Sequence, residues 1–318
     1  LAENRPVVPR AEQVTFEQGV QAVVNNFKLK GRKSLDELER RIRLHLLPYF
    51  RGRRLASITN ACAEAYAVHR QKQGIVRKGE RISDVSNAEI NRELQHLKRI
   101  FSLAVKQNRL GSTPHITMLP EHNVRTGFFE PAALSSVLRH LPTELQPVIQ
   151  FAAITGWRVG SEVLPLEWRR IDFPAGEVRL DAGTTKNGKA RVFPMNAALR
   201  QLLQEQHRKH EELKQAGQLV PWVFWRMKAE RRGGPQQPQQ IRSLTKAWNR
   251  ACRVAGQPGR IPHDLRRTAV RNLVRAGVSR STAMALVGHR TESVFERYNI
   301  TSGDDLRDAA RRLDAAGF

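Results

Sequence analysis

The second half of the chain carries polar residues whose types suit the cleavage of a phosphodiester bond. Cationic groups can grip and protonate phosphate oxygens, imidazoles can move protons, and a phenol can attack phosphorus. The six residues are Arg158 in TGWRVGSE, Lys186 in TTKNGK, His263 and Arg266 in HDLRRT, His289 in GHR, and Tyr298 in FERYNI. A packed core has no use for such a set. The set predicts a reaction at phosphorus without a metal, and we expect no cofactor.

The spacing of these residues favours joint action on one phosphate. His263 precedes Arg266 by three positions, so a helix would place both on one face. The planar fork of an arginine matches two phosphate oxygens, so Arg158 and Arg266 can hold the non-bridging oxygens of one phosphodiester. A phenol, with a pKa of about 10, attacks poorly at neutral pH unless neighbouring cations favour its phenolate. Tyr298, nine residues after His289, is the predicted nucleophile.

The order and context of these motifs resemble those of the tyrosine recombinases, the phage integrase family. The resemblance covers roughly residues 14–315, and HDLRRT, then Gly288-His289, then Tyr298 form its most specific part. It implies a site-specific DNA recombinase that cuts and rejoins DNA through a 3′-phosphotyrosyl bond, for integration or excision of a phage or mobile element. The alternatives are a type IB topoisomerase, which shares this chemistry, and a DNA-binding relative without activity.

The resemblance also implies a role for each residue of the set. Tyr298 would attack the scissile phosphate, and Lys186 would protonate the departing 5′ oxygen. His263 would act as general acid and base near the nucleophile, while His289 would donate a hydrogen bond to a phosphate oxygen. Lys189, three residues beyond Lys186, is the competing candidate for the lysine.

Two acidic residues are expected to support the site from a second layer. The family often places an acid three positions after the first arginine, whereas Glu162 lies four positions after Arg158. The resemblance therefore does not fix the place of Glu162 beside that arginine. Asp264 is expected to orient the start of its own helix or a neighbouring arginine.

The charge balance indicates a polyanionic partner. The 318 residues include 54 Lys and Arg against 30 Asp and Glu, a formal net charge of +24. Charge alone would also fit a ribosomal or chromatin protein, because any phosphate contact releases counterions. Together with the six residues it predicts double-stranded DNA as the partner. The resemblance implies a homo-tetramer on recombining sites and a monomer or dimer in solution, and it leaves an accessory DNA-bending protein open.

Cysteine usage and hydropathy indicate a reducing compartment and no membrane. Cys62 and Cys252 cannot make a disulfide framework, and no apolar stretch is long enough to span a bilayer. We expect the cytoplasm of a bacterial or phage-infected cell. No signal peptide opens the chain, and its start at Leu1 instead of Met favours a trimmed sequence. His207 and His210 lack a third ligand nearby, so we expect an exposed pair and no metal site.

Hydrophobic periodicity divides the chain into two domains. We expect an N-terminal extension over 1–13, a helical core-binding, DNA-binding domain over 14–111, a linker over 112–126, and a catalytic domain with a C-terminal helix over 127–318. The predicted fold class is mainly α with a small antiparallel β-sheet. The resemblance implies a two-domain tyrosine recombinase architecture, with a mixed α/β catalytic domain and a C-shaped clamp around duplex DNA.

Two apolar stripes predict helices in the first domain. One follows a candidate capping box at Ser86–Glu89 and comprises Ile90, Leu94, Leu97, Phe101 and Ala104. The other comprises Leu35, Leu38, Ile42 and Leu46 and ends near Pro48. The expected DNA-binding residues are Arg53, Arg54, Arg92, Lys98 and Arg99, with Lys189 in the second domain. Solvated helix faces are the alternative for each of these charges.

The second domain shows one strong strand signal. Glu177–Leu180 and Ala190–Met195 flank a turn that contains Asn187-Gly188, which predicts a hairpin with Lys186 beside its tip. The segment from Arg226 to Gln240 is predicted to be a mobile loop. A helix is expected from Asp304 onward, with acids first and arginines later. In relatives such a helix docks on the neighbouring protomer, and an intramolecular cap is the alternative.

Overall fold

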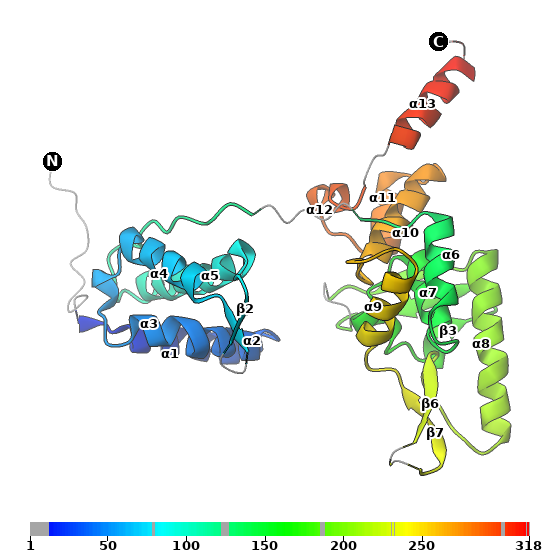
Figure 1. Cartoon of the computed structure of the whole chain (residues 1–318), viewed down its shortest axis with the longest axis horizontal. Coiled ribbons are helices and arrows are strands. Elements are labelled where there is room, and N and C mark those ends of the chain that lie inside the picture. The colour runs from blue at the N-terminus through cyan, green and yellow to red at the C-terminus, as the bar shows by residue number, and fades with distance from the viewer. Residues whose placement is uncertain are drawn as a thin grey trace. The chain divides into compact units, whose positions relative to one another are not determined.

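The structure, a computed structural model, describes residues 13–77, 80–121, 127–184, 188–229, 231, 233–299, 303–315 and 317. The chain divides into two compact units, Leu1–Asn123 and Val124–Phe318 (Figure 1). Each unit buries its own apolar core. No described helix is long and apolar enough to cross a membrane.

The first unit is mainly helical. Its elements are α1 (Phe16–Leu29), α2 (Leu35–Arg41), the π-helix η2 (Ile42–Leu46), α3 (Leu47–Phe50), the 3₁₀ turn η3 (Leu55–Ser57), α4 (Asn60–Gln73), strands β1 (Ile75–Arg77) and β2 (Glu80–Ser83), and α5 (Asn87–Lys106). A capping box starts α1, because the side chains of Thr15 and Gln18 each accept a hydrogen bond from the other's backbone N–H. α1 packs along α5, and Phe16 and Phe27 are buried in the core.

The helix predicted after Ser86 is confirmed as α5. The residues of its predicted stripe are all buried: Ile90, Leu94, Leu97, Phe101 and Ala104. Ser86 caps the helix by accepting a hydrogen bond from the Glu89 N–H. The Glu89 carboxylate binds Arg41 and Arg92, each at 2.8 Å. These bonds replace the return bond of a capping box and tie α5 to α2.

The helix predicted to end near Pro48 continues past it. After α2 the chain widens into η2 and runs on as α3 to Phe50. Proline lacks an N–H, and its ring crowds the carbonyl four residues earlier in an α-helix. In η2 the hydrogen bonds reach five residues back, as from Leu47 N–H to the Ile42 carbonyl. The wider turn lets the helical path pass the proline.

The first part of the predicted linker packs against the first unit. Residues 112–121 form neither helix nor strand. Ile116 is nevertheless buried, and Leu119 exchanges two backbone-to-side-chain hydrogen bonds of 2.8 Å with Asn91 of α5. The remaining residues of the predicted linker, 122–126, lie outside the described residues.

The second unit combines helices with two small antiparallel sheets. Its elements are α6 (Pro131–Arg139), α7 (Gln146–Thr155), the π-helix η4 (Val159–Val163), the 3₁₀ turn η5 (Trp168–Arg170), β3 (Ile171–Asp172), β4 (Glu177–Leu180), β5 (Arg191–Pro194), α8 (Ala197–Gln215), β6 (Trp225–Ala229), β7 (Gln236–Gln240), α9 (Thr245–Val254), α10 (Asp264–Arg275), α11 (Arg280–Val287), α12 (Glu292–Glu296) and α13 (Gly303–Ala315). The first sheet has the order β3-β4-β5, and β6 pairs with β7. The predicted fold class, mainly α with a small antiparallel β-sheet, is confirmed, although the described residues form more than one such sheet.

The strands predicted around Asn187-Gly188 are confirmed as β4 and β5, with Val178 opposite Phe193. Their connection is longer than a two-residue turn and is closed by a 3.0 Å hydrogen bond from Gly183 N–H to the Gly188 carbonyl. Residues 185–187 lie outside the described residues. The predicted place of Lys186 beside the tip therefore stays a prediction.

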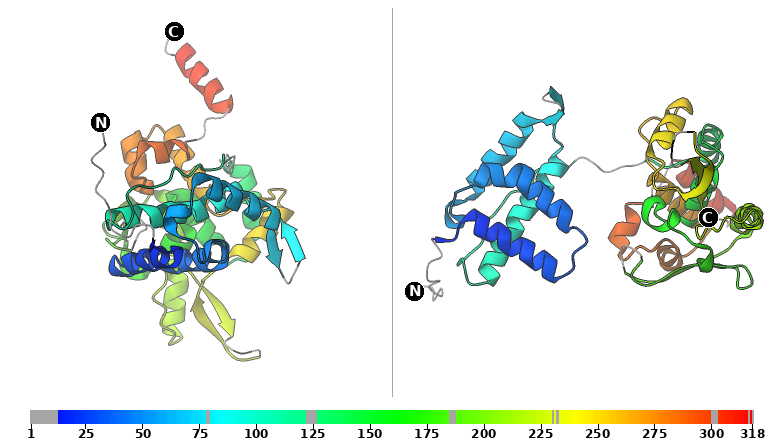
Figure 2. Two further views of the ribbon diagram at one scale, coloured as in Figure 1. Left: turned by 90° about the vertical axis from the view of Figure 1, so that its left-hand side faces the viewer. Right: turned by 90° about the horizontal axis from the view of Figure 1, so that it is seen from below.

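The predicted loop from Arg226 to Gln240 is wrong, because most of it forms the β6–β7 hairpin. This hairpin, yellow in Figure 1, projects from its unit in the same direction as α8 (Figure 2). In β6 the apolar Trp225, Met227 and Ala229 alternate with Arg226 and Lys228, whereas β7 consists of four glutamines and a proline. The first strand therefore carried a strand signal that the loop prediction overlooked, and only the glutamine-rich β7 carried none.

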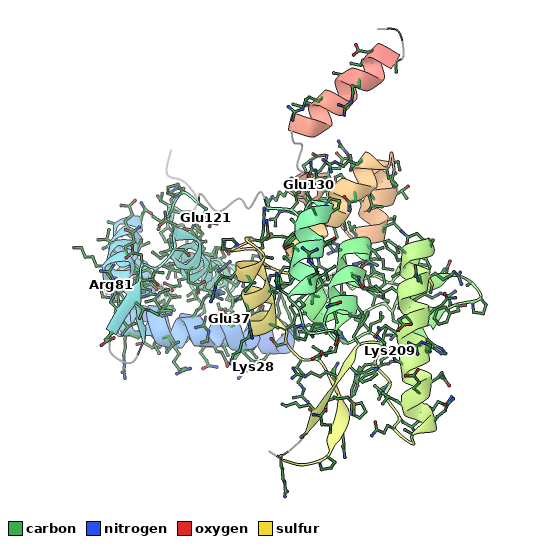
Figure 3. All side chains as sticks on the ribbon, turned by 45° about the vertical axis from the view of Figure 1, so that its right-hand side comes forward. Lys28, Glu37, Arg81, Glu121, Glu130 and Lys209 are labelled. Atoms are coloured by element: carbon green, nitrogen blue, oxygen red, sulfur yellow. The ribbon has the colours of Figure 1, made fainter. Side chains whose placement is uncertain are left out.

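Hydrogen bonds join the start of α6 to α10 in the second unit. Glu130, at the start of α6 and labelled in Figure 3, accepts hydrogen bonds from Arg271 at 2.6 Å and Arg275 at 3.3 Å. The backbone N–H of Phe129 donates to the Thr268 hydroxyl at 2.9 Å. All three partners lie on α10, the helix that carries HDLRRT.

The predicted C-terminal helix is confirmed as α13.

Candidate active site

The first predicted arginine follows the end of α7. Gly156 ends that helix with a φ of +67°, and Trp157 is buried directly after it. Arg158 then binds Glu162 twice: its backbone N–H donates at 2.8 Å and its Nη1 at 2.6 Å. The residues between them lie in the π-helix η4. Arg158 is the N-cap of this turn, and the carboxylate four residues later reaches both its N–H and its guanidinium.

The second predicted arginine, Arg266 of α10, is only 2% exposed. Its Nη1 donates to the Gly156 carbonyl at 2.7 Å, and its Nε donates to His289 Nε2 at 3.0 Å. Its buried Nη2 has no hydrogen-bond partner among the described residues. A buried cationic donor without a partner is costly. Arg266 is thus held rigidly with one donor group left for an anion.

His289 follows the left-handed Gly288 that ends α11. Burial, followed by the charges of Arg266, Arg158 and Arg191, lowers the pKa of His289 to about 3. The neutral ring accepts from Arg266 at Nε2 and therefore carries its proton on Nδ1. Nδ1 is buried without a partner in the described part of the chain. The ring can donate this hydrogen bond to a phosphate oxygen.

Tyr298 lies just beyond α12 and meets both histidines. Its hydroxyl is 2.6 Å from His263 Nε2, and its ring centroid is 4.6 Å from that of His289. The guanidinium carbons of Arg266 and Arg267 lie 5.7 and 5.3 Å from the centre of the phenol ring. Both guanidinium groups are therefore cation–π partners of the phenol ring.

His263 precedes α10 and is suited to accept the phenol proton. Burial, followed by the positive charges of Arg266, Arg267 and Arg158, lowers the pKa of His263 to about 4. At neutral pH the imidazole is uncharged, so one ring nitrogen can accept a proton from Tyr298 across the 2.6 Å contact. A hollow of about 420 Å³ beside His263 is lined by Arg158 and Arg266 and leaves room for a phosphate.

Asp264 is fully buried at the start of α10. One carboxylate oxygen accepts from the Ile261 N–H at 2.9 Å, and the other accepts from Arg267 Nη1 at 2.7 Å. The first bond fixes the entry to the helix, and the second directs Arg267 towards the ring of Tyr298. Asp264 is thus linked to Tyr298 through Arg267.

Five of the six predicted residues thus lie together in the second unit, and Lys186 lies outside the described residues. Lys189, the competing lysine, is exposed. Most of the predicted DNA-binding residues of the first unit have partners within it. Arg92 pairs with Glu89, Arg54 donates to the Gln13 carbonyl, and Arg53 and Arg99 lie over aromatic rings, whereas Lys98 is half-buried.

Sequence reasoning missed two arginines of the site, Arg191 and Arg267. Arg191 opens β5, where burial alternates, so it shares the inner face with Phe193 while Val192 faces solvent. That alternation is the signal by which Arg191 could have been found, because successive strand residues face opposite sides. Arg267 carries no comparable mark in the sequence.

The predicted exposed histidine pair is half-buried instead. The rings of His207 and His210 pack against Trp168, with centroids at 5.2 and 5.1 Å. The sequence could not show this contact, because Trp168 lies far from both in the chain. Among the described residues, no three His, Cys, Asp or Glu side chains gather as metal ligands.

Comparison with known proteins identifies the class. Residues 129–302 match the model of the phage integrase family, and the chain belongs to this family. It is 25% identical over 228 residues to the integrase of Salmonella phage P22, an alignment that covers 70% of this chain and 56% of that protein. The chain thus spans about half the length of this curated relative.

Solved structures share the fold. A fragment of the Tn1549 transposon integrase, in complex with a circular intermediate DNA, aligns with a TM-score of 0.70 at 18% identity and covers 93% of this chain and 99% of that chain. A lambda integrase dimer bound to a COC′ core site aligns with a TM-score of 0.65 at 18% identity, over 90% of this chain and 77% of that chain. A lambda integrase tetramer bound to a Holliday junction aligns with a TM-score of 0.67 at 18% identity, over 91% of this chain and 79% of that chain.

Proposed function

We propose that this protein is a site-specific DNA recombinase that cuts and rejoins DNA through a 3′-phosphotyrosyl intermediate. The observation that carries the proposal is the 2.6 Å contact between the Tyr298 hydroxyl and His263 Nε2, in a cluster that also holds two arginines and a neutral histidine. Membership of the phage integrase family supports it.

Cleavage begins at the phenol. The Tyr298 oxygen attacks the scissile phosphorus while His263 takes its proton. The bond from phosphorus to the 5′ oxygen breaks, and Lys186 gives the departing oxygen a proton. The 3′ end stays bound to Tyr298, and a 5′-hydroxyl is released.

Charge that develops on the phosphate during this step needs fixed cations. Arg266 offers its unpartnered Nη2, and Arg158 borders the same hollow. Nδ1–H of His289 adds a neutral donor. Groups already held in place stabilise a transition state without having to reorganise.

The second half of the reaction reverses the first. A 5′-hydroxyl from a partner strand attacks the phosphotyrosyl bond, its proton passes to Lys186, and Tyr298 regains its proton from His263. Because the link to Tyr298 preserves the energy of the broken ester, no nucleotide cofactor is needed. Exchange between two sites then integrates or excises a phage or mobile element.

The partner of this reaction is double-stranded DNA, as the net charge of +24 favours. A homo-tetramer would act on two recombining sites, with a monomer or dimer free in solution and an accessory DNA-bending protein as an optional addition. The lambda integrase, whose dimer and tetramer are known on DNA, supports this assembly by analogy of fold. The reaction would take place in the cytoplasm of a bacterial or phage-infected cell.

Two-site recombination tests the proposal. A supercoiled plasmid that carries the DNA flanking both ends of the encoding element is incubated with the protein, and the products are sequenced. We expect molecules in which DNA from the two sites is joined. Relaxed plasmid without joined products would instead indicate a topoisomerase, and unchanged plasmid a DNA-binding protein without activity.

A further inference from the structure

Arg191 is a buried arginine that the reaction described above does not use. It lies at the first position of β5, opposite Leu180 of β4, and is 7% exposed. A buried guanidinium is costly unless its charge and its donors are matched. Its surroundings therefore show what it holds in place.

The first contact of Arg191 is with Glu162. Arg191 Nη1 lies 3.2 Å from Glu162 Oε2, the same oxygen that accepts the backbone N–H of Arg158. Glu162 is 1% exposed, and its other oxygen binds the Arg158 guanidinium. Two arginines thus share one buried carboxylate. If Arg158 turns its side chain towards a phosphate, Arg191 remains to hold Glu162 charged and fixed.

The second contact of Arg191 is with the turn that presents His289. A Cβ placed on Gly288 would overlap the Arg191 guanidinium, so the side chain occupies the space that glycine leaves open. The guanidinium carbon also lies 5.7 Å from the centre of the Trp157 ring. One side chain therefore touches the segments that carry Arg158 and His289.

We propose that Arg191 is a positioning residue of DNA cleavage, which locks Glu162 and the Gly288–His289 turn so that Arg158 and His289 meet the scissile phosphate together. The inference rests on the proposed function and deepens it. Arg191 itself acts through Glu162 and the turn, and Arg158 and Arg266 line the hollow without it.

The charges around Glu162 make the proposal testable by pH. The charged and titratable groups that face this region are Arg158 from its own segment, Arg191 from β5, Arg266 from α10 and His289 at the end of α11. Burial raises the pKa of Glu162, but the Arg158 N–H and the charges of Arg191 and Arg158 outweigh it, so the net pKa is lowered. Loss of Arg191 must raise this pKa. Glu162 would then protonate, and release Arg158, at a higher pH than in the wild type.

The experiment measures covalent adduct formation on a nicked suicide substrate at saturating DNA. Arg191→Met should lower the rate about 10- to 100-fold, as expected for a small displacement of reacting groups. The affinity for DNA should stay within about twofold of wild type. The ratio of wild-type to Arg191→Met rates should increase as the pH falls from about 8 to about 5.5. In a Glu162→Gln background this increase should disappear, because the amide does not titrate.

Two further variants separate positioning from general damage. Arg191→Lys keeps the charge and loses the planar fork, so we expect an intermediate rate without the added pH dependence. If a thermal melt shows that Arg191→Met is not folded, the cleavage rate of Arg191→Lys provides the test instead. Arg179→Gln removes an exposed arginine of the neighbouring strand, which pairs with Glu177, and should match wild type within about twofold.

The pKa of His289 can be measured without DNA cleavage, so it tests the role of Arg191 independently of the proposed function. In free protein with ¹⁵N-labelled histidine, Arg191→Met should raise the pKa of His289, because one neighbouring cation is lost. The positioning role would be wrong if the pKa of His289 stayed unchanged. It would also be wrong if the rate losses of Glu162→Gln and Arg191→Met multiplied in the double variant. Failure of the wild type to form an adduct would overturn the proposed function and leave the NMR test in force.

Discussion

His263, the proposed proton acceptor, can take a proton from Tyr298 only while its imidazole is uncharged. His263 sits 2.6 Å from the Tyr298 hydroxyl, and burial with three nearby arginines lowers its pKa to about 4. Imidazoles in solution hold a proton below about pH 6.5. Between these two pH values the His263 imidazole stays neutral in the folded protein and is protonated in the unfolded chain.

This difference predicts a titration midpoint for His263 near pH 4 in the free protein. The free energy of unfolding should fall as the pH decreases from about 6.5 to about 4, because the unfolded state binds more protons over that range. NMR of ¹⁵N-labelled histidine measures the midpoint, with His263→Ala to assign the signal. A midpoint near 6.5 would contradict the arrangement described for this residue.

A second prediction separates Lys186 from Lys189 as the general acid. A 5′-thiolate leaves without protonation, so a substrate with sulfur at the scissile 5′ position should rescue only a variant that lacks the acid. We expect Lys186→Ala to cleave ordinary DNA slowly and the thio substrate nearly as fast as wild type. Lys189→Ala should be close to normal on both.

Arg158→Ala is the control for this rescue. It removes charge that stabilises the transition state, so it should stay slow on both substrates. Selective rescue of Lys189→Ala would show that the hairpin presents the other lysine, and would leave the recombinase proposal standing.

The clustering of residues at the candidate site could be predicted where a residue type has a chemical purpose that packing does not supply. Arg266, His289 and Tyr298 were visible in this way. Arg191 was not, because its purpose is to pair with Glu162, which lies 29 positions earlier in the chain. A contact of this kind exists only in the folded chain. In the sequence, only the alternation of β5 points to it.

Two glycines that follow the helices α10 and α11 differ in the space around them. Gly288 and Gly277 both have a φ of +75°, but a Cβ on Gly288 would overlap Arg191, whereas a Cβ on Gly277 would meet nothing within 4 Å. Gly277→Ala should therefore cost only the left-handed strain of about 1–2 kcal/mol. Gly288→Ala should cost about 1–3 kcal/mol more, because it also displaces a packed side chain. Urea unfolding measures both, and equal losses would mean that Arg191 does not fill the space at Gly288.

The helices could be predicted from the sequence better than their irregular turns. The stripe from Ile90 to Ala104 gave α5 because apolar residues recur at helical spacing and nothing interrupts them. The same reasoning stopped a helix near Pro48 and left Glu162 out of register with Arg158. A π-helix lies at both places, and such a turn has no periodic signature in the sequence.

For the whole molecule, binding to DNA should be governed by charge. The logarithm of the binding constant falls by about 0.9 per neutralised phosphate with each tenfold rise in salt, so about six contacts would weaken binding roughly 1,000-fold between about 50 and about 200 mM salt. Removal of residues 1–125 should weaken binding far more than single substitutions in the site. Fluorescence anisotropy over a salt series tests both, and equal affinity of the shortened and the full chain would refute a DNA-binding role for the first unit.

Trapping of the covalent adduct tests whether Tyr298 attacks DNA. The chain has three tyrosines, and Tyr49 and Tyr66 lie in the first unit, where Tyr66 donates to buried Glu93 at 2.5 Å. With a nicked suicide substrate and a denaturing gel, the wild type and Tyr49→Phe should both form a DNA-linked band. Tyr298→Phe should form none and still bind duplex within about twofold of wild type, because it loses one oxygen and little packing area. A DNA-linked band from Tyr298→Phe would contradict the account.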